Sequence, residues 1–594
     1  MIGQEREGIN KGAGNSIFRE KKLFFMGFGL GALLFVLIFG IRVLDVTNDS
    51  WIFALPDPDI EQHYIGWVHF RKAPWGLPLG LMNSLSYPYS MSVLWTDSIP
   101  IVAILFKAIE GILPETFQYL GWYGLLSMAL TGGFATLLVK KVTGNRVLSL
   151  IAVFVYSLSF PIQQRMFYHT TLTAHWLILL PLLLWLDDFR DRPLGRKCLV
   201  WGLLSFLGVT IHPYLWAMGE LLLIFALLEE LLSGGRIGHV AITFLCTIGA
   251  ALFGLWLEGA FYGSVNAGWP IGGFESNFNT FFNSLGDGKV FPAFPLQVGF
   301  QYEGFGYLGA GVLLLLAISG IFLLVKAIRT LSYGKRTGDG KPLLSLRRKL
   351  LLLAFLVFFL AAVFPKISFN EALIFELPMP DAVKRFFGIF RSNGRFIWVA
   401  DYLLMTFSFW GISRIRGSEK EDKDLSSAPD KGTLTAGGEA VPLIICLCCA
   451  LLQLYDMSDN LQKKHEVFTA SYTEAHCDLD QPAFIAALKP YHHLVMTYSA
   501  HLDNMRFAYF AGCRGLTINR FYFARDIDER TDARLQEYYE DAFQGNIEED
   551  CLYLLNRDSY EAAWKKCPLY FYDVGGTIVG APKPLPGCLP YEPG

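Results

Sequence analysis

The sequence predicts an α-helical polytopic membrane protein of about eleven transmembrane helices, followed by a small C-terminal α/β domain. Apolar residues make up 53% of the 594 residues, charged residues make up only 17%, and the mean hydropathy is +0.36. A typical soluble chain carries roughly 25% charged residues, so this chain lacks the polar surface that a soluble protein needs. The net charge of −3 argues against nucleic acid as a partner, because phosphate-backbone binding needs a basic excess.

Apolar runs that could cross a bilayer recur along the first 456 residues. A membrane-crossing helix needs about 20 mainly apolar residues. The eleven runs lie near residues 23–44, 117–139, 146–162, 172–187, 197–212, 214–232, 238–261, 306–328, 349–365, 396–413 and 440–456. The first is too long for a signal-peptide core and is interpreted as a retained helix. The sequence therefore predicts a transmembrane domain over residues 23–456, after a cytoplasmic N-terminus of residues 1–22.

Lys and Arg are concentrated in every second connection of this pattern, beginning with the N-terminus. Cytoplasmic loops are enriched in these residues, so we expect the N-terminus to lie in the cytoplasm. Three long loops, 45–116, 262–305 and 366–395, then lie outside. An odd number of spans also places residues 457–594 outside.

The C-terminal region, residues 457–594, alternates strand-like and helix-like runs. The strand-like runs are Leu494–Tyr498, Cys551–Leu555 and Leu569–Asp573, and the helix-like runs are Asp532–Phe543 and Ser559–Lys566. This alternation predicts a small extracytoplasmic α/β domain. The region contains five of the ten cysteines, so up to two disulfides are compatible with an oxidising compartment.

The first outer loop contains the strongest candidate for a catalytic acid. Pro58 suits the first position of a helix and Asp57 its N-cap, so Asp59 and His63 lie four residues apart on one helical face. An ionisable side chain at the edge of the membrane is a functional candidate. We therefore assign Asp59 as the catalytic acid or base, with Asp57 as the fallback and His63 beside it. A helix cap for Asp57 and a solvated first-turn position for Asp59 are the structural alternatives.

Further polar candidates lie at the predicted outer ends of the spans. Asp97 precedes Pro100 by three residues, so it is either a helix N-cap or a substrate-binding acid. His169, His175 and His212 each suit ordinary packing when taken singly. Their place on one side of the bilayer, together with His63, favours a shared polar cavity.

A basic cluster with interleaved phenylalanines occupies the third outer loop. It contains Lys384, Arg385, Arg391 and Arg395. Arginine binds phosphate through a planar fork, so we expect these residues to hold a lipid phosphate, with snorkelling to ordinary headgroups as the alternative. Glu303 lies among aromatic residues in the second loop, a combination that suits a sugar.

Six segments together resemble a bacterial family of multi-pass membrane proteins that is itself similar to the GT-C glycosyltransferase superfamily. These segments are Asp59–Trp75, Thr96–Pro100, Arg165–Leu180, Gln301–Gly309, Phe390–Trp398 and Gln453–Asp456. The resemblance implies a polytopic helical fold, a large first outer loop with the catalytic acid, and a sugar donor carried on a polyprenyl phosphate. The superfamily's acid would correspond to Asp59, with Asp57 as the second choice.

The residues and the resemblance lead to the same functional hypothesis. Asp59 would act as general base in an inverting transfer of a sugar from a polyprenyl-phosphate donor to a cell-surface glycan or lipid-linked acceptor, among membrane lipids. Arg391 and Arg395 would hold the phosphate, with Lys384 or Arg385 assisting. No residue spacing demands a metal, and a divalent cation such as Mg²⁺ or Mn²⁺ on Asp57 and Asp59 stays an alternative. The competing functions are a flippase for a lipid-linked saccharide and a non-catalytic subunit of a glycan-assembly machine.

Overall fold

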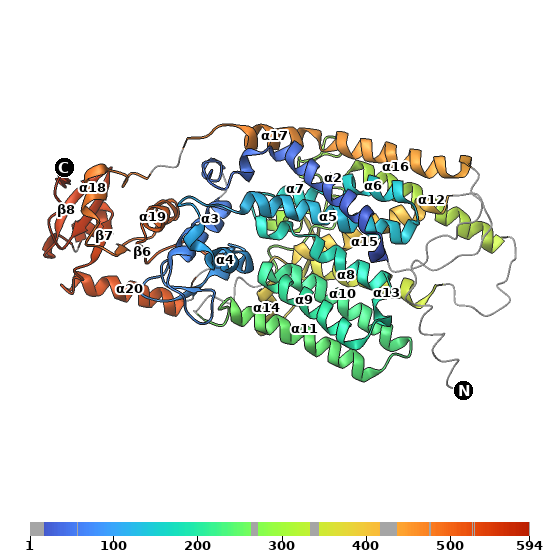
Figure 1. Ribbon diagram of the computed structural model, residues 1–594, viewed down its shortest axis with the longest axis horizontal. Helices are drawn as coiled ribbons and strands as arrows, with labels where there is room; N and C mark the ends of the chain where they lie inside the picture. Colours follow the sequence, from blue (N-terminus) through green and yellow to red (C-terminus); the bar gives the residue numbers. More distant parts are fainter. Residues whose placement is uncertain are drawn as a thin grey trace.

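The computed structural model describes most of the chain. The described residues are 17–55, 58–262, 271–332, 344–415, 436–473, 477–525, 527, 529–562 and 564–592. They form a bundle of long helices with a smaller mixed domain at one end, which we call the domain end of the bundle (Figure 1). The predicted helical bundle and the small C-terminal sheet domain are therefore both present.

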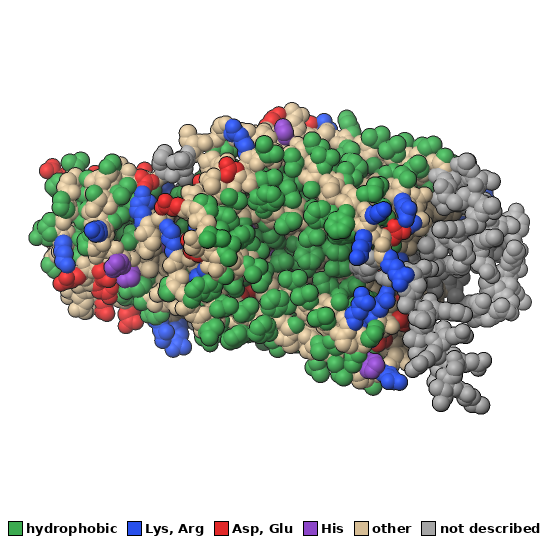
Figure 2. Space-filling view, viewed as in Figure 1, with side chains coloured by type: hydrophobic (Ala, Val, Ile, Leu, Met, Phe, Trp, Pro, Cys, Tyr) green, Lys and Arg blue, Asp and Glu red, His purple; other side chains and the backbone are tan. Residues whose placement is uncertain are grey.

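Eight helical segments in the described part of the chain are long and apolar enough to cross a membrane. They are Lys21–Phe39, Leu120–Thr143, Arg146–Arg165, Leu194–Ile211, Ile237–Leu257, Ala310–Arg329, Asn393–Ser413 and Ala440–Thr469. Hydrophobic side chains cover the middle of the face in Figure 2, and Lys and Arg side chains gather where the bundle ends. This distribution is typical of a protein whose central zone lies in lipid.

The remaining three of the eleven predicted spans are also helices. Helix α8 (Trp176–Leu186) is only 11 residues long. Helices α10 (Pro213–Leu232) and α13 (Leu346–Val363) each carry three charged residues. Length and composition therefore support eight candidate spans, and the count of eleven stays a prediction.

The other helices of the bundle pack closely together. They are α2 (Lys21–Phe39), α5 (Leu120–Thr143), α6 (Arg146–Tyr156), α7 (Phe160–Arg165), α9 (Leu194–Ile211), α11 (Ile237–Leu257), α12 (Ala310–Ser332), α15 (Ile397–Ser413), α16 (Ala436–Asp456) and α17 (Ser458–Thr469). Glycines let α2 and α5 approach closely, since a Cβ on Gly31 would lie 2.6 Å from the Met128 carbonyl oxygen. Small residues at helix contacts are a usual means of packing in membranes.

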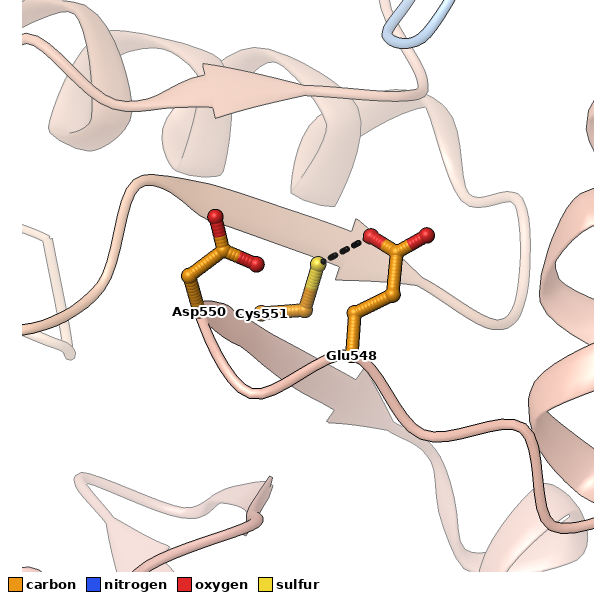
Figure 3. A group of neighbouring side chains, drawn as sticks. All are labelled: Glu548, Asp550 and Cys551. Carbon is orange, nitrogen blue, oxygen red and sulfur yellow. Dashed lines mark hydrogen bonds between the residues drawn. The ribbon is translucent and has the colours of Figure 1, made fainter.

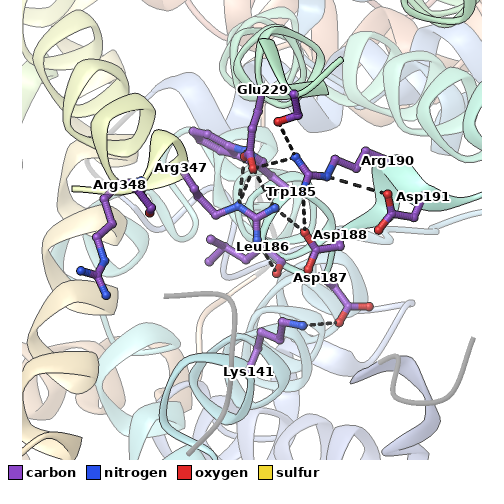
Figure 4. A network of polar contacts seen from close by, with 12 residues as sticks. Lys141, Trp185, Leu186, Asp187, Asp188, Arg190, Asp191, Glu229, Arg347 and Arg348 are labelled. Atoms are coloured by element: carbon purple, nitrogen blue, oxygen red, sulfur yellow. Dashed lines mark hydrogen bonds and ion pairs between the residues drawn. The ribbon is translucent and has the colours of Figure 1, made fainter. Parts of the chain in front are cut away.

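An ionic network joins α8, the segment of residues 188–190, α10 and α13 (Figure 4). It lies at the C-terminal end of α10 and the N-terminal end of α13. The Glu229 carboxylate accepts hydrogen bonds from the Trp185 indole at 2.6 Å, from Arg190 at 3.0 Å and from Arg347 at 3.0 Å. Arg347 also pairs with Asp188. One charge of α10, Glu229, and one of α13, Arg347, thus neutralise each other inside the protein.

The loop of residues 45–116 folds over the domain end of the bundle. It contains α3 (Pro58–Lys72), α4 (Pro100–Lys107) and a two-stranded pair, β1 (Leu81–Met82) with β2 (Met91–Ser92). The start of α3 at Pro58 confirms the predicted helix. A second two-stranded pair, β3 (Lys366–Phe369) with β4 (Ala372–Glu376), and helix α14 (Asp381–Phe387) lie in the third long loop.

The C-terminal domain is built on a mixed six-stranded sheet, which confirms the predicted α/β character. The strand order is β10-β8-β9-β7-β5-β6, from Leu589–Pro590, Tyr570–Val574, Thr577–Ala581, Cys551–Leu555, His493–Met496 and Thr517–Ile518. Strands β5, β6 and β7 are parallel, and β8 to β10 pair antiparallel. Its helices are α18 (Pro482–Ala487), α19 (His501–Cys513), α20 (Glu529–Phe543) and α21 (Arg557–Ala562). All ten cysteines are free thiols.

This domain docks directly onto the first long loop. Backbone hydrogen bonds join Ile518 of the edge strand β6 to Ser84 at 2.8 Å and to Tyr87 at 3.1 Å. His69 on α3 lies 2.7 Å from the Ala508 carbonyl oxygen of α19. Sheet and helix contacts therefore hold the C-terminal domain against the segment that carries Asp59.

We expect Glu229→Gln to lower the thermal midpoint of the detergent-solubilised protein. Removing one partner of a buried ion pair typically costs about 3–5 kcal/mol, because the remaining charges stay desolvated. Unfolding followed by tryptophan fluorescence measures the change. The control is Glu561→Gln, whose surface pair with Lys565 is screened by solvent and should leave the midpoint nearly unchanged. Equal midpoints for both variants would contradict a stabilising role for the network.

Candidate functional site

A cavity of about 500 Å³ opens at the domain end of the bundle. Its wall combines residues from α3, the loop after η3 (Val93–Thr96), α10, the 299–305 segment, the 389–395 segment and the C-terminal domain. The polar residues of the wall are Asp59, Gln62, Asp97, His169, His212, Tyr214, Tyr302, Glu303, Arg391, Ser392, Arg395, Tyr522 and Arg525. Segments separated by more than four hundred residues thus meet around one space.

Asp59 lies in the first turn of α3, half-buried at the edge of the cavity. The N-terminal end of a helix favours negative charge. His169 Nδ1 lies 3.0 Å from Asp59 Oδ2, and the Tyr522 hydroxyl donates to Asp59 Oδ1 at 3.4 Å. Burial lowers the pKa of His169 well below its ordinary value, so the imidazole is neutral. Asp59 thus lies between the imidazole of His169 and the phenol of Tyr522.

Glu303 joins two guanidiniums in the interior of the site. It lies 2.9 Å from Arg165 and 2.8 Å from Arg395, and all three side chains are almost fully buried. Burial by itself would raise the pKa of Glu303, but the Arg165 and Arg395 guanidiniums hold it well below its ordinary value. His169 Nε2 lies 3.8 Å from the same carboxylate. The carboxylate therefore links the basic residues to the imidazole that contacts Asp59.

Asp97 faces the basic side of the cavity. It ends η3 with a left-handed backbone at φ 50°, and Ile99 is the N-cap of α4, so the predicted N-cap position for Asp97 is wrong. The N-cap alternative arose because Pro100 follows three residues later, but the left-handed residues Asp97 and Ile99, on either side of Ser98, separate the two helices. Burial raises the pKa of Asp97 to about 6, against the opposing effect of Arg395, Arg391 and Arg525.

Arg391 and Arg525 lie across from each other on this basic side. The Arg391 guanidinium donates to the Ala524 carbonyl oxygen at 3.0 Å, and Arg525 donates to the Ile389 carbonyl oxygen. Arg391 lies 5.7 Å from the centre of the Phe274 ring, and Arg525 lies 5.9 Å from that of Trp95. The arrangement places guanidiniums and aromatic rings together, as anion-binding sites do.

Two family models match the chain. One is described as Domain of unknown function (DUF6311) and covers residues 28–458, and the other is the DUF6311 C-terminal domain, which covers residues 483–582. The chain belongs to the DUF6311 family. No curated protein matches the sequence. The boundary between the two matched regions follows the end of α16, so the DUF6311 domain and its C-terminal domain correspond to the bundle and the sheet domain.

Several predicted site residues of this DUF6311 protein lie away from the cavity. His63 is buried one turn further along α3, and its ring nitrogens have no hydrogen-bond partner among the described residues. Burial lowers its pKa to about 3, so the ring is neutral. His175 Nδ1 lies 2.6 Å from the Tyr402 hydroxyl inside the bundle. Lys384 and Arg385 lie on α14, none of whose residues is buried.

Asp57 falls outside the described residues, so the predicted cation pair with Asp59 has no described geometry. Within the described ranges, one group of side chains could hold a metal ion, namely Glu548, Asp550 and Cys551 (Figure 3). Cys551 Sγ donates to Glu548 at 3.1 Å. These residues belong to the C-terminal domain, and none of them lines the cavity.

The sequence interpretation missed the residues that the DUF6311 C-terminal domain supplies to the cavity. Tyr522 and Arg525 line it, and Gln62 donates to the Tyr522 carbonyl oxygen at 2.8 Å. The run from Arg520 to Arg525 interleaves basic and aromatic residues, as the run from Lys384 to Phe396 does. That shared pattern was the available signal, although nothing in the sequence placed the two runs together.

Glu303→Gln should destabilise the protein, since both buried guanidiniums would then lack their carboxylate. The expected cost is about 3–5 kcal/mol, measured as a lower denaturation midpoint. Adding Arg165→Gln to this variant removes one unpaired charge and should recover part of the loss, because contacting residues are coupled. Strictly additive losses would contradict the shared ion pair.

Asp97→Asn should remove a pH dependence of stability. The pKa of Asp97 is raised from 3.8 to about 6, so the folded protein holds a proton that the unfolded chain releases. That stabilisation is complete below pH ~4 and is lost as the pH rises through ~6. The wild-type midpoint should therefore fall more between pH 5 and pH 7.5 than that of Asp97→Asn, whose amide tolerates a left-handed backbone. Parallel profiles for the two proteins would rule out this effect, and exposed Asp381→Asn serves as the control.

Proposed function

We propose that this protein is a membrane glycosyltransferase that transfers a sugar from a polyprenyl-phosphate donor to an extracytoplasmic glycan or lipid-linked acceptor. The observation that supports the proposal is the shared cavity wall, which contains Asp59 together with Arg391, Arg395 and Arg525. A base and an anion-binding group facing one space are the two components that such a displacement needs.

The composition of the cavity wall suits a donor with a lipid tail. Apolar side chains from the helix ends line one part of it, including Val209, Trp216, Leu255, Phe300 and Phe390. Helices α9 and α11, which supply Val209 and Leu255, are both candidate spans. A prenyl chain that enters from the bilayer would meet these residues while its phosphate meets the arginines.

The proposed step is a single displacement at the anomeric carbon. Asp59 takes the proton from the acceptor hydroxyl as the acceptor oxygen bonds to that carbon, and the bond to the donor phosphate oxygen breaks with its electron pair. Guanidiniums stabilise the departing phosphate where its charge develops. His169 Nδ1, 3.0 Å from Asp59 Oδ2, is the imidazole placed to orient the carboxylate, whereas the sequence had placed His63 beside Asp59. One displacement inverts the anomeric configuration.

The proposed location is the bacterial inner membrane, with the cavity on the outer side. The Lys and Arg side chains at the opposite end of the bundle (Figure 2) suit a cytoplasmic face under the positive-inside rule. This orientation places the N-terminus in the cytoplasm and the C-terminal domain outside. A divalent cation near Asp59 stays an alternative part of the mechanism, with EDTA sensitivity as its test.

Asp59→Asn should lower the transfer rate by about 10²- to 10⁴-fold, the usual effect of removing a general base. The assay measures polyprenyl phosphate released from a radiolabelled lipid-linked sugar by the purified full-length protein. Glu61→Gln is the matched control, because Glu61 lies on the same helix but does not line the cavity.

Wild-type activity in Asp59→Asn would refute the assignment of the base. If the wild-type protein releases no polyprenyl phosphate but moves the labelled lipid across proteoliposomes, the flippase alternative replaces the transferase. If it does neither, the non-catalytic subunit is favoured.

A further inference from the structure

Arg395, which the sequence predicts to hold a phosphate, is already paired with a carboxylate. Its Nε and Nη2 atoms both lie 2.8 Å from Glu303 Oε2, and its guanidinium stacks 4.8 Å from the centre of the Tyr214 ring. The charge of Arg395 is thus directed into the protein. The group that meets an anion at the open part of the cavity must come from elsewhere on its wall.

Arg391 and Arg525 both line the cavity, and each donates a hydrogen bond to the chain segment that carries the other. Arg391 donates to the carbonyl oxygen of Ala524, next to Arg525, and Arg525 donates to the carbonyl oxygen of Ile389, close to Arg391. The two contacts form a reciprocal latch between the third loop of the bundle and the C-terminal domain. Each of these cavity-lining arginines is positioned by a backbone carbonyl oxygen of the facing segment.

The charge balance of the site favours an anion. Among the described residues of the cavity wall and the Glu303 ion pair, Arg165, Arg391, Arg395 and Arg525 are cationic, whereas Asp59, Asp97 and Glu303 are the acids. Asp97 is an acid on which Arg391, Arg395 and Arg525 all act electrostatically. The rings of Phe274 and Trp95 lie 5.7 Å and 5.9 Å from the guanidiniums of Arg391 and Arg525, so the two latch arginines are partly enclosed by aromatic side chains.

We propose that Arg391 and Arg525 together bind the phosphate of the donor, so that the C-terminal domain supplies one half of an anion clamp. This inference rests on the proposed function for the identity of the ligand as a lipid phosphate. Two planar guanidiniums on facing segments match the several oxygens of a phosphate group. Arg525 is then a donor-binding residue, and the C-terminal domain forms part of the donor site.

The test compares binding of farnesyl phosphate to the full-length protein in detergent, followed by tryptophan fluorescence. Arg525→Gln should weaken farnesyl phosphate binding by about tenfold to a hundredfold, the usual effect of losing charge-assisted hydrogen bonds. Arg525→Lys should recover only part of it, because an ammonium lacks the bidentate fork. The control is Arg506→Gln, which breaks surface pairs with Asp478 and Asp503 in the same domain.

Two further ligands show which chemistry is recognised. Binding of farnesol should be equal in the wild type and in Arg525→Gln, because it lacks the phosphate. Competition by inorganic phosphate would indicate that the clamp accepts free phosphate, and its absence would indicate that the lipid is required. Arg391→Gln should weaken farnesyl phosphate binding in the same way. This second variant tests the clamp even if Arg525→Gln fails to fold.

Normal binding of farnesyl phosphate by folded Arg525→Gln would overturn the clamp, as would an equal loss in Arg506→Gln. The outcome is separate from that of the catalytic proposal, because Asp59→Asn should bind farnesyl phosphate like the wild type while losing transfer. A wild-type protein that binds farnesol and farnesyl phosphate equally would refute both the clamp and the lipid-phosphate donor.

Discussion

The ion pair of Glu303 with Arg165 and Arg395 is the interaction on which the rest of the site depends. It joins α7, the 299–304 segment and the start of the Asn393–Ser413 span. The backbone approaches closely here because Gly304 and Gly394 lack side chains, and Ser276 donates to both of their carbonyl oxygens. A Cβ on Gly304 would lie 2.3 Å from the Ser276 hydroxyl. Tight backbone packing thus positions the charges that the cavity needs.

The sequence identified much of the cavity because the membrane restricts where polar residues can lie. Apolar spans leave charged side chains at helix ends, so Asp59, Glu303, Arg391 and Arg395 were recognisable before the fold was known. The local role of each was harder to predict. Helical spacing placed His63 on the face of Asp59, but that part of α3 is buried in the protein, and His169 reaches the carboxylate from another segment.

Arg525 and the number of spans show what the sequence could not reveal. Arg525 reaches the cavity because β6 pairs with residues 84–87 and carries the following segment across the opening. Such docking depends on tertiary contacts that leave no periodic pattern. In the same way, the charged residues of α10 and α13 count against membrane spans in the sequence. The sequence does not show that Glu229 and Arg347 neutralise each other in the folded protein.

The late position of residues 522–525 has a consequence for biosynthesis. The ribosome completes all eight candidate membrane spans of the described residues before it reaches this segment, since the last of them ends at Thr469. The cavity of a nascent chain therefore lacks part of its wall until nearly nine-tenths of the chain has been translated. Docking of the final sheet then closes the cavity, so the order of synthesis by itself delays maturation of the site until insertion is over.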